Sequence, residues 1–391
     1  MNNTRREFLR TGSVVLAACA LPPFSVAAPA SASKKIYRAV VIGRTGGGDY
    51  GHGYERIFSG LDNVTLEAIA DRNPEGLKKA AERSGAKRQY ADFREMLAKE
   101  KPDLVSIAPR QPDCHKEMAL AAIEAGAGIF MEKPMTETVA DADQILAAAE
   151  KKGTKLVIAH NRRWTPEFTR VKALLDQGLI GKVREVRIQG KQDSRAGGED
   201  LIVLGTHDFD LMRYYFGDPS WCFAAVLTQG RDVGRGDVRR GAEPIVVAGD
   251  TIRAMFAFPN NLMVHWDSVK TGDHFNTRFS SRENWAFEIF GTKGIIAYQA
   301  GFGFCWLNSP YLAHKDETRW RDLPSPESGS LPDHAAHPIK SLIHAMETNT
   351  QPVCGGVDGR WAVEMVAAVY QSHLAKARVN FPLAERKRPP L

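Results

Sequence analysis

The stretch Gly128-Ile129-Phe130-Met131-Glu132-Lys133-Pro134-Met135 decides the fold of this chain. Its apolar half is typical of a strand buried on both faces of a parallel sheet. Polar groups at the carboxyl end of such a strand face the crevice where α/β sheets bind ligands. Glu132 and Lys133 therefore form either an ion pair beside a bound cofactor or a structural ion pair on a turn closed by Pro134. The residues on either side distinguish the two interpretations.

A glycine-rich turn lies upstream, after a predicted strand over residues 37–42. Gly43 and Gly48 occupy the first and sixth positions of the G-x-G-x-x-G pattern, and Thr45 occupies the middle position. A strand, such a turn and a helix together bind the pyrophosphate of a dinucleotide at the helix N-terminus. We therefore expect a helix after the turn, and cofactor contacts from Gly43, Thr45, Gly46 and Gly48.

An acidic residue follows the second predicted strand, which spans residues 64–70. Asp71 lies 23 residues after Gly48, near the spacing expected of a carboxylate that binds the cofactor ribose. A carboxylate there repels a 2′-phosphate and favours NAD, while the neighbouring Arg72 leaves NADP open. We expect His52 to face the substrate and not a metal, because no acid or cysteine accompanies it at metal-ligand spacing.

Strands and helices then alternate through the first part of the chain. Predicted strands over residues 103–108 and 155–159 flank the opening stretch. The alternation predicts a doubly wound parallel sheet of the Rossmann type. The first domain is expected over residues 34–158. Its predicted helices span residues 74–85, 92–100, 116–126 and 139–153.

Residues 159–391 are predicted to form an α+β domain with a large, mostly antiparallel sheet. Residues 184–189 alternate between polar and apolar side chains, as a half-exposed strand does. Two further pairs of strands are joined by hairpin turns at Pro259-Asn260-Asn261 and Thr292-Lys293-Gly294. Loops or lids are expected over residues 230–245 and 318–335, and closing helices over 339–348 and 361–376.

The composition is that of an ordinary globular protein, with 43% apolar and 25% charged residues. The net charge of +6 is not gathered into a run, so neither nucleic acid nor a polybasic membrane contact is expected. No apolar stretch is long enough to span a bilayer. No metal is expected either, because four cysteines lack metal-ligand spacing: Cys114, Cys222, Cys305 and Cys354.

Residues 1–33 are predicted to be an export signal and not part of the fold. Arg5-Arg6 precedes an apolar stretch over residues 14–21, the pattern of a twin-arginine signal. The twin-arginine export machinery would then deliver the protein to the periplasm or beyond. An alternative is a lipoprotein signal, in which Cys19 would anchor the mature chain. Two small-residue cleavage sites follow, at Ala28-Pro29-Ala30 and Ala30-Ser31-Ala32.

These motifs resemble the Gfo/Idh/MocA family of nicotinamide-dependent sugar oxidoreductases over nearly all of the chain after the signal. The order and spacing of the motifs carry the resemblance, because each motif is weak alone. They are the Gly43 turn, Asp71, Ala108-Pro109 with His115, Glu132-Lys133-Pro134, and residues 160–164, 178–183, 205–210 and 291–294. The family implies a second domain whose sheet covers the active site with one face. The other face commonly joins subunits, so we expect a homo-oligomer.

The resemblance also implies roles for single residues. Lys133 would lie between the cofactor ribose and the substrate hydroxyl, where an ammonium stabilises an alkoxide and shuttles a proton. His207 matches the family's acid/base, with a helix-start histidine bonded to backbone as the alternative. Further cofactor contacts are expected from Arg72, Pro109, His115 and Glu132. Substrate contacts are expected from Asn161, Arg162, Arg163 and Asp210, with surface charge as the alternative for either arginine.

One position departs from the family pattern. Members often carry aspartate four residues before the histidine, as the third member of a Lys-Asp-His group, whereas this chain has Val203. Either a neighbouring acid substitutes or the proton path differs. The neighbouring acids, all out of register, are Glu199, Asp200, Asp208 and Asp210.

The leading functional hypothesis is an exported NAD-dependent oxidoreductase that acts on a sugar or sugar derivative. Because no dependable pool of free NAD exists outside the cytoplasm, we expect the cofactor to be bound tightly and returned to its starting state. An alternative enzyme uses transient oxidation to cleave a glycosidic bond or to epimerise its substrate. A non-catalytic carbohydrate-binding protein is a third hypothesis, which Val203 supports and Lys133 and His207 oppose.

Overall fold

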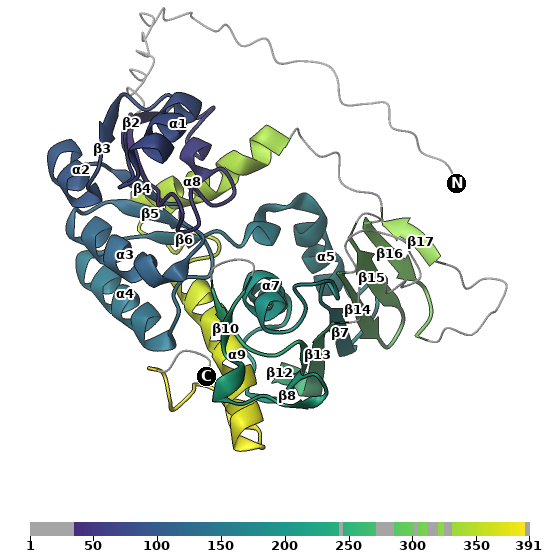
Figure 1. Ribbon diagram of the computed structural model, residues 1–391. Coiled ribbons are helices and arrows are strands. Elements are labelled where there is room, and N and C mark those ends of the chain that lie inside the picture. The colour runs from purple at the N-terminus through teal and green to yellow at the C-terminus, as the bar shows by residue number, and fades with distance from the viewer. Residues whose placement is uncertain are drawn as a thin grey trace, which may run out of the picture. The chain divides into compact units, whose positions relative to one another are not determined.

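The computed structural model describes residues 35–241, 245–270, 285–300, 303–310, 320–323 and 331–387. The predicted export signal lies outside these residues. Two large sheets organise the described chain, a parallel one in the N-terminal part and a mostly antiparallel one after it (Figure 1). The predicted combination of an α/β Rossmann domain with a large second sheet is confirmed.

The first sheet has six strands, all parallel, in the order β3-β2-β1-β4-β5-β6. The chain reverses direction across the sheet between β1 and β4, which makes their carboxyl ends the topological switch point. The opening stretch forms β5, whose residues are fully buried as a near-continuous apolar run requires. The strands are β1 (Tyr37–Ile42), β2 (Val64–Ala70), β3 (Arg88–Tyr90), β4 (Leu104–Ile107), β5 (Gly128–Met131) and β6 (Leu156–Ile158).

Four helices connect these strands, and their starts follow from the sequence. The side chain of Asn73 accepts a hydrogen bond from the amide of Gly76, and that of Thr138 accepts one from the amide of Asp141. Such caps satisfy amide groups that have no partner within the helix. The helix predicted over residues 139–153 thus begins directly after its cap. The helices are α1 (Pro74–Ser84), α2 (Phe93–Glu100), α3 (His115–Glu124) and α4 (Val139–Lys152).

The helix expected after the glycine-rich turn is absent: between β1 and β2, all of which is described, the only helical segment is the single 3₁₀ turn Tyr54–Arg56. The physical reason is the backbone conformation of the turn. Gly46, Gly48, Gly51 and Gly53 all have positive φ angles between 62° and 88°, which cannot start or continue a right-handed helix. The prediction of a helix N-terminus at this place was therefore wrong.

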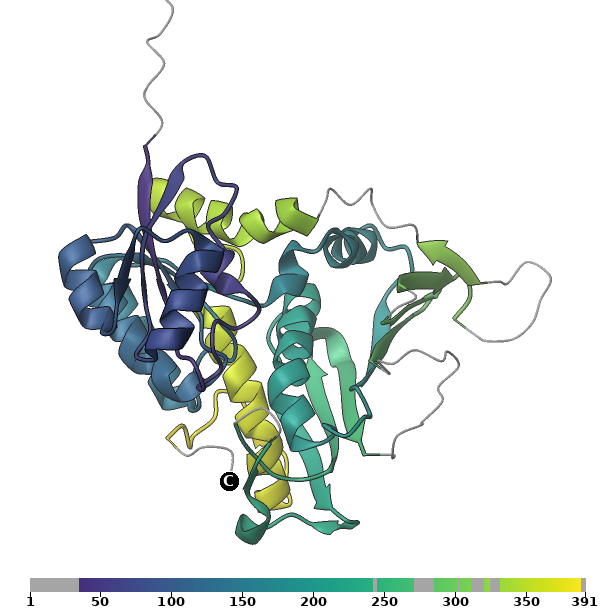
Figure 2. The same ribbon diagram turned by 45° about the horizontal axis from the view of Figure 1, so that its top comes forward.

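Helix α8 (Leu331–Thr348) returns from the C-terminal part of the chain to the first sheet, where it packs on β5 and β6 (Figures 1 and 2). Gly128 permits the approach, because a Cβ there would lie 2.4 Å from the sulfur of Met346. The hydroxyl of Tyr37 also donates to Glu347 over 2.8 Å. One helix of the Rossmann domain therefore comes from the last quarter of the sequence.

The second sheet has ten described strands, antiparallel except where β7 pairs with β13. Both predicted hairpin turns are confirmed, between β12 and β13 and between β14 and β15. A small sheet of β10 (Arg239–Arg240) and β11 (Val246–Val247) lies apart from it. The ten strands are β7 (Val183–Gln189), β8 (Trp221–Thr228), β9 (Arg231–Asp232), β12 (Thr251–Phe258), β13 (Leu262–Val269), β14 (Ala286–Gly291), β15 (Ile295–Gln299), β16 (Gly303–Leu307), β17 (Trp320–Leu323) and β18 (Val379–Asn380).

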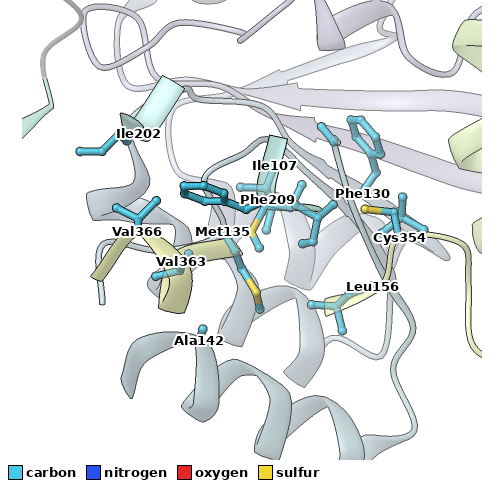
Figure 3. Close-up of a cluster of buried hydrophobic side chains, with 14 of the residues drawn as sticks. Ile107, Phe130, Met135, Ala142, Leu156, Ile202, Phe209, Cys354, Val363 and Val366 are labelled. Carbon is cyan, nitrogen blue, oxygen red and sulfur yellow. The ribbon is translucent and has the colours of Figure 1, made fainter. Parts of the chain in front are cut away.

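Helix α9 (Gly356–Ala375) contacts both halves of the fold, because it packs against β8, α4 and α7 (Thr206–Phe216). In Figure 3 its residues Val363 and Val366 lie with Met135 and Ile202 in one buried apolar cluster. The described chain here also contains α5 (Pro166–Asp176), α6 (Gly198–Asp200), the π-helical turn Leu201–Gly205 and the 3₁₀ turns Asn161–Trp164, Arg235–Asp237 and Pro259–Asn261. No helix within the described ranges has the length and hydropathy needed to cross a membrane.

Candidate active site

The carboxyl end of β5 presents the two polar groups that the opening stretch predicted. Glu132 is fully buried and Lys133 is 4% exposed. One carboxylate oxygen of Glu132 lies 3.1 Å from Nδ1 of His52. The ammonium of Lys133 donates a hydrogen bond over 3.1 Å to the backbone carbonyl of Val203. Each of the two groups therefore has an observed partner on another segment of the chain.

Val203 lies in the π-helical turn Leu201–Gly205, directly before α7. The wider backbone of a π turn changes where its carbonyl groups point, and such turns recur at functional sites. The carbonyl of Val203 thus accepts from Lys133 at the position where the family resemblance leads one to expect an aspartate. A neutral main-chain acceptor takes the place of a carboxylate.

Two histidines lie near Lys133. The rings of His207, on α7, and His160, after β6, meet edge to face with centroids 5.4 Å apart. Among the described residues, neither nitrogen of His160 nor Nδ1 of His207 has a hydrogen-bond partner. Burial, together with the nearby cations Lys133 and Arg162, holds the pKa of His207 well below its ordinary value. Burial also lowers the pKa of His160, to about 3, so both imidazoles are neutral at pH 7.

Three of the four acidic residues near Val203 have observed partners of their own. Asp208 accepts from Trp266 over 2.8 Å, from Trp285 over 3.1 Å and from Arg162. Asp200 accepts from Ser268 over 2.8 Å, and burial raises its pKa to about 7. Asp210 pairs with an arginine, and Glu199 is 3% exposed. Asp200, Asp208 and Asp210 therefore each have an observed partner other than Lys133.

The three polar residues after His160 have buried partners. Nδ2 of Asn161 donates over 3.0 Å to the hydroxyl of Tyr54. Arg162 stacks on the ring of Trp285, with 3.6 Å between its guanidinium carbon and the ring centroid. Arg163 donates to Asp210 over 2.7 Å and to Asp358 over 3.0 Å. Both arginines and Asp210 thus form ion pairs that fix the walls of the site, and surface charge, the alternative for the arginines, does not describe them.

A cavity of about 220 Å³ lies at the carboxyl ends of β1 and β2, beside the switch point. Asp71 lines it, and its carboxylate accepts from the amide and hydroxyl of Thr45 over 2.9 and 2.7 Å. Thr45 therefore orients the expected ribose-binding carboxylate. The other lining residues are Ile42, Gly43, Arg44, Ala70, Arg72, Ala91, Phe93, Asp113, Cys114, Glu117 and Met118.

His115 contacts the segments that follow β4 and β5 and does not line this cavity. It is fully buried, with Nε2 2.7 Å from the carbonyl of Pro109 and Nδ1 2.9 Å from that of Pro134. Burial lowers its pKa. Its expected contribution to cofactor binding is therefore indirect, through the segments after β4 and β5 that it holds in place.

The glycine-rich turn folds onto the segment that follows β4. The amide of Arg110 donates to the carbonyl of Gly48 over 3.2 Å, and a Cβ on Gly48 would lie 2.3 Å from that amide nitrogen. Without a helix N-terminus, a positive charge at the cavity comes from Arg44, which pairs with Asp113 over 2.6 Å. The sequence interpretation missed Arg44, although a basic residue directly after Gly43 is a visible signal.

These residues fit a bound NAD. The cavity beside Asp71 would hold the adenosine part, and Arg44 would offer charge to the pyrophosphate. Among the described residues, Glu132, His160 and His207 keep buried polar atoms without a hydrogen-bond partner, which a bound cofactor and substrate could engage. Across the described ranges no group of three or more His, Cys, Asp or Glu side chains is arranged to hold a metal ion. Fold and site together define a two-domain, nicotinamide-dependent oxidoreductase.

Comparison with known proteins identifies the family. Residues 37–160 match the NAD-binding Rossmann fold of the Gfo/Idh/MocA oxidoreductases, and residues 168–297 match the Gfo/Idh/MocA C-terminal domain. Because the two matches span both domains, the chain belongs to the Gfo/Idh/MocA family. It is an oxidoreductase, and NAD is its cofactor.

Individual relatives agree with this assignment. Oxidoreductase YrbE of Bacillus subtilis is 25% identical over 86% of this chain and 94% of its own length. Levoglucosan dehydrogenase of Pseudarthrobacter phenanthrenivorans is 27% identical over 66% of this chain and 73% of its own. A levoglucosan dehydrogenase solved with NADH and L-sorbose has a TM-score of 0.73 at 22% identity, over 89% of this chain and 100% of that one. The structural likeness confirms the fold.

Proposed function

We propose that the protein oxidises a hydroxyl group of a sugar or sugar derivative, holds its NAD(H) tightly and recycles it internally, outside the cytoplasm. The observation that carries the proposal is Lys133, whose buried ammonium lies at the end of β5 beside neutral His207. Relatives named levoglucosan dehydrogenase, myo-inositol 2-dehydrogenase and D-apiose dehydrogenase support a polyhydroxylated substrate.

The two groups suit the proton transfer that alcohol oxidation needs. Bound NAD supplies the acceptor for the hydride. The ammonium of Lys133 stabilises negative charge on the substrate oxygen, and burial strengthens that interaction. The imidazole of His207 is neutral and has an unpaired Nδ1, so it can accept the hydroxyl proton. We propose that the sugar lies between these groups, with His52, Asn161, Arg162, Arg163 and Asp210 as the candidates for contacts to its hydroxyls.

Internal recycling follows from the proposed location. The twin-arginine pattern at Arg5-Arg6 supports export of a folded protein to the periplasm, and Cys19 offers lipid anchoring as the alternative. An exported enzyme that released its reduced cofactor would stop after a single turnover. N-terminal sequencing of the envelope protein tests the location, since a major stable species that retains Met1 contradicts both versions. Light scattering tests the homo-oligomer proposed to form through the C-terminal sheet.

The test of the proposal is cofactor content. The protein is purified without added nucleotide and denatured, and the released NAD(H) and NADP(H) are quantified. We expect about one equivalent per chain, because a dissociation constant far below the protein concentration leaves the site filled during purification. An empty protein that turns over continuously with added NAD would contradict the proposal.

A second candidate, transient oxidation coupled to cleavage or epimerisation, is favoured by the main-chain acceptor at Val203. The departure from a Lys-Asp-His group removes one feature of the simple dehydrogenases that this chain resembles. Analysis of the products from an aryl glycoside distinguishes the two, because net oxidation gives a ketone or lactone whereas cleavage releases the phenol. A non-catalytic carbohydrate-binding protein would bind sugar and produce neither.

A further inference from the structure

The pair formed by Glu132 and His52 is a second proton-handling unit at the active site. Its distance of 3.1 Å joins a carboxylate with no exposed surface to an imidazole whose side chain is 50% exposed. An ionised carboxylate only accepts hydrogen bonds, so Nδ1 of His52 is the donor. That assignment leaves the lone pair on Nε2, the arrangement that a carboxylate imposes on a histidine base.

The glycine-rich turn is built to hold this pair. A Cβ on Gly51 would lie 2.8 Å from the carboxylate oxygen of Glu132 and 2.5 Å from the carbonyl of Ala108, so only glycine lets the turn approach so closely. The rings of His52 and Tyr54 lie 5.9 Å apart. The pair joins His52 to the carboxylate that directly precedes Lys133 in the chain, at the carboxyl end of β5.

Oxidation of one hydroxyl needs one proton acceptor, and Lys133 with His207 already supplies it. Resting on the function proposed above, we propose that His52, oriented by Glu132, is a second general base that removes a proton from the carbon next to the newly formed sugar carbonyl. The C–H proton moves to Nε2 of His52, and its electron pair forms the C=C bond of an enolate. The imidazolium then returns the proton, or the electron pair expels the oxygen substituent on the next carbon.

Heavy water reports this step directly. A base that exchanges its proton with solvent introduces deuterium at a carbon atom of the sugar. Simple oxidation and re-reduction introduces none, because the same hydride leaves and returns. The purified holoenzyme is mixed in heavy water with para-nitrophenyl glucosides, galactosides and mannosides of both anomeric forms. Oxidation is measured by rapid-mixing absorbance of the reduced nicotinamide. Deuterium incorporation is measured by mass spectrometry and proton NMR of the recovered sugars.

We expect the wild-type protein to show both signals with at least one glycoside. His52→Gln should lower the deuterium incorporated per molecule of cofactor reduced by about 100-fold or more, the usual effect of losing a proton-transfer group, whatever its effect on substrate binding. His265→Gln is the matched control, since His265 is also partly exposed and lies 3.9 Å from Glu185 on the second sheet. It should leave both signals unchanged. Added imidazole should restore exchange in His52→Ala, because the position is open to solvent.

The outcomes separate the two proposals. A wild-type absorbance signal without deuterium overturns the second base and leaves the oxidoreductase function standing. Retained incorporation in His52→Gln with a raised KM also overturns it, because His52 would then only bind substrate. If the wild-type protein gives neither signal with any glycoside, the proposed function fails and the second base with it.

Discussion

Lys133 is a buried ammonium that donates a hydrogen bond to the neutral carbonyl of Val203. Lys133→Ala should lower turnover by about 100-fold or more, because it removes the group that stabilises the alkoxide and moves its proton. Turnover is measured with whichever glycoside reduces the bound cofactor, and thermal unfolding checks the fold. Lys172→Ala, which removes an exposed ion pair with Asp176, is the control. Normal turnover, or an unfolded variant, would favour the purely structural role.

The glycine-rich turn takes the place of a helix and seats its backbone against the segment after β4. Gly48→Ala should weaken NAD binding by about tenfold or more, an effect of roughly 1.4 kcal/mol, because its Cβ would meet the backbone of Arg110. Gly60→Ala is a matched control: its φ of +77° carries a similar strain to +88° at Gly48, yet no atom of another segment lies within 4 Å of its Cβ, and Gly60 is not an expected cofactor contact. Calorimetric titration of the stripped proteins measures both affinities. Equal losses in the two variants would mean that strain, and not packing of the turn, is responsible.

The sequence predicted elements whose cause is local and missed those whose cause is distant. The extent of β5 follows from its apolar run, and the start of α4 follows from the cap at Thr138. The missing helix after β1 depended on positive φ angles, which G-x-G-x-x-G matching does not report. The acceptor for Lys133 could not be predicted, because the carbonyl of Val203 belongs to the backbone and its direction depends on a π turn with no residue signature. The buried pairing of Arg163 with Asp210 likewise depended on tertiary contacts.

At the scale of the whole molecule, buried neutral histidines make stability depend on pH. The pKa of His160 is about 3 in the folded chain against 6.5 ordinarily, so between these values the unfolded chain binds more protons and stability falls as the pH falls. The loss is about 1.4 kcal/mol per pH unit below 6.5 for this one group. His160→Gln should therefore flatten the decline in free energy of unfolding between about pH 6 and pH 4, measured by urea titration. His344→Gln, which alters an exposed histidine, is the control, and parallel curves for His160→Gln and the wild type would contradict the assignment.

The return of α8 to the first sheet bears on how the protein is made. The ribosome completes all six strands of that sheet by Ile158, yet the helix that covers β5 and β6 begins only at Leu331. For the synthesis of more than 170 intervening residues, part of an apolar sheet has no cover from its own chain. A nascent or truncated chain thus displays the surface that chaperones bind, and the finished chain hides it. The exposed face of β5 and β6 therefore distinguishes an unfinished chain from a finished one.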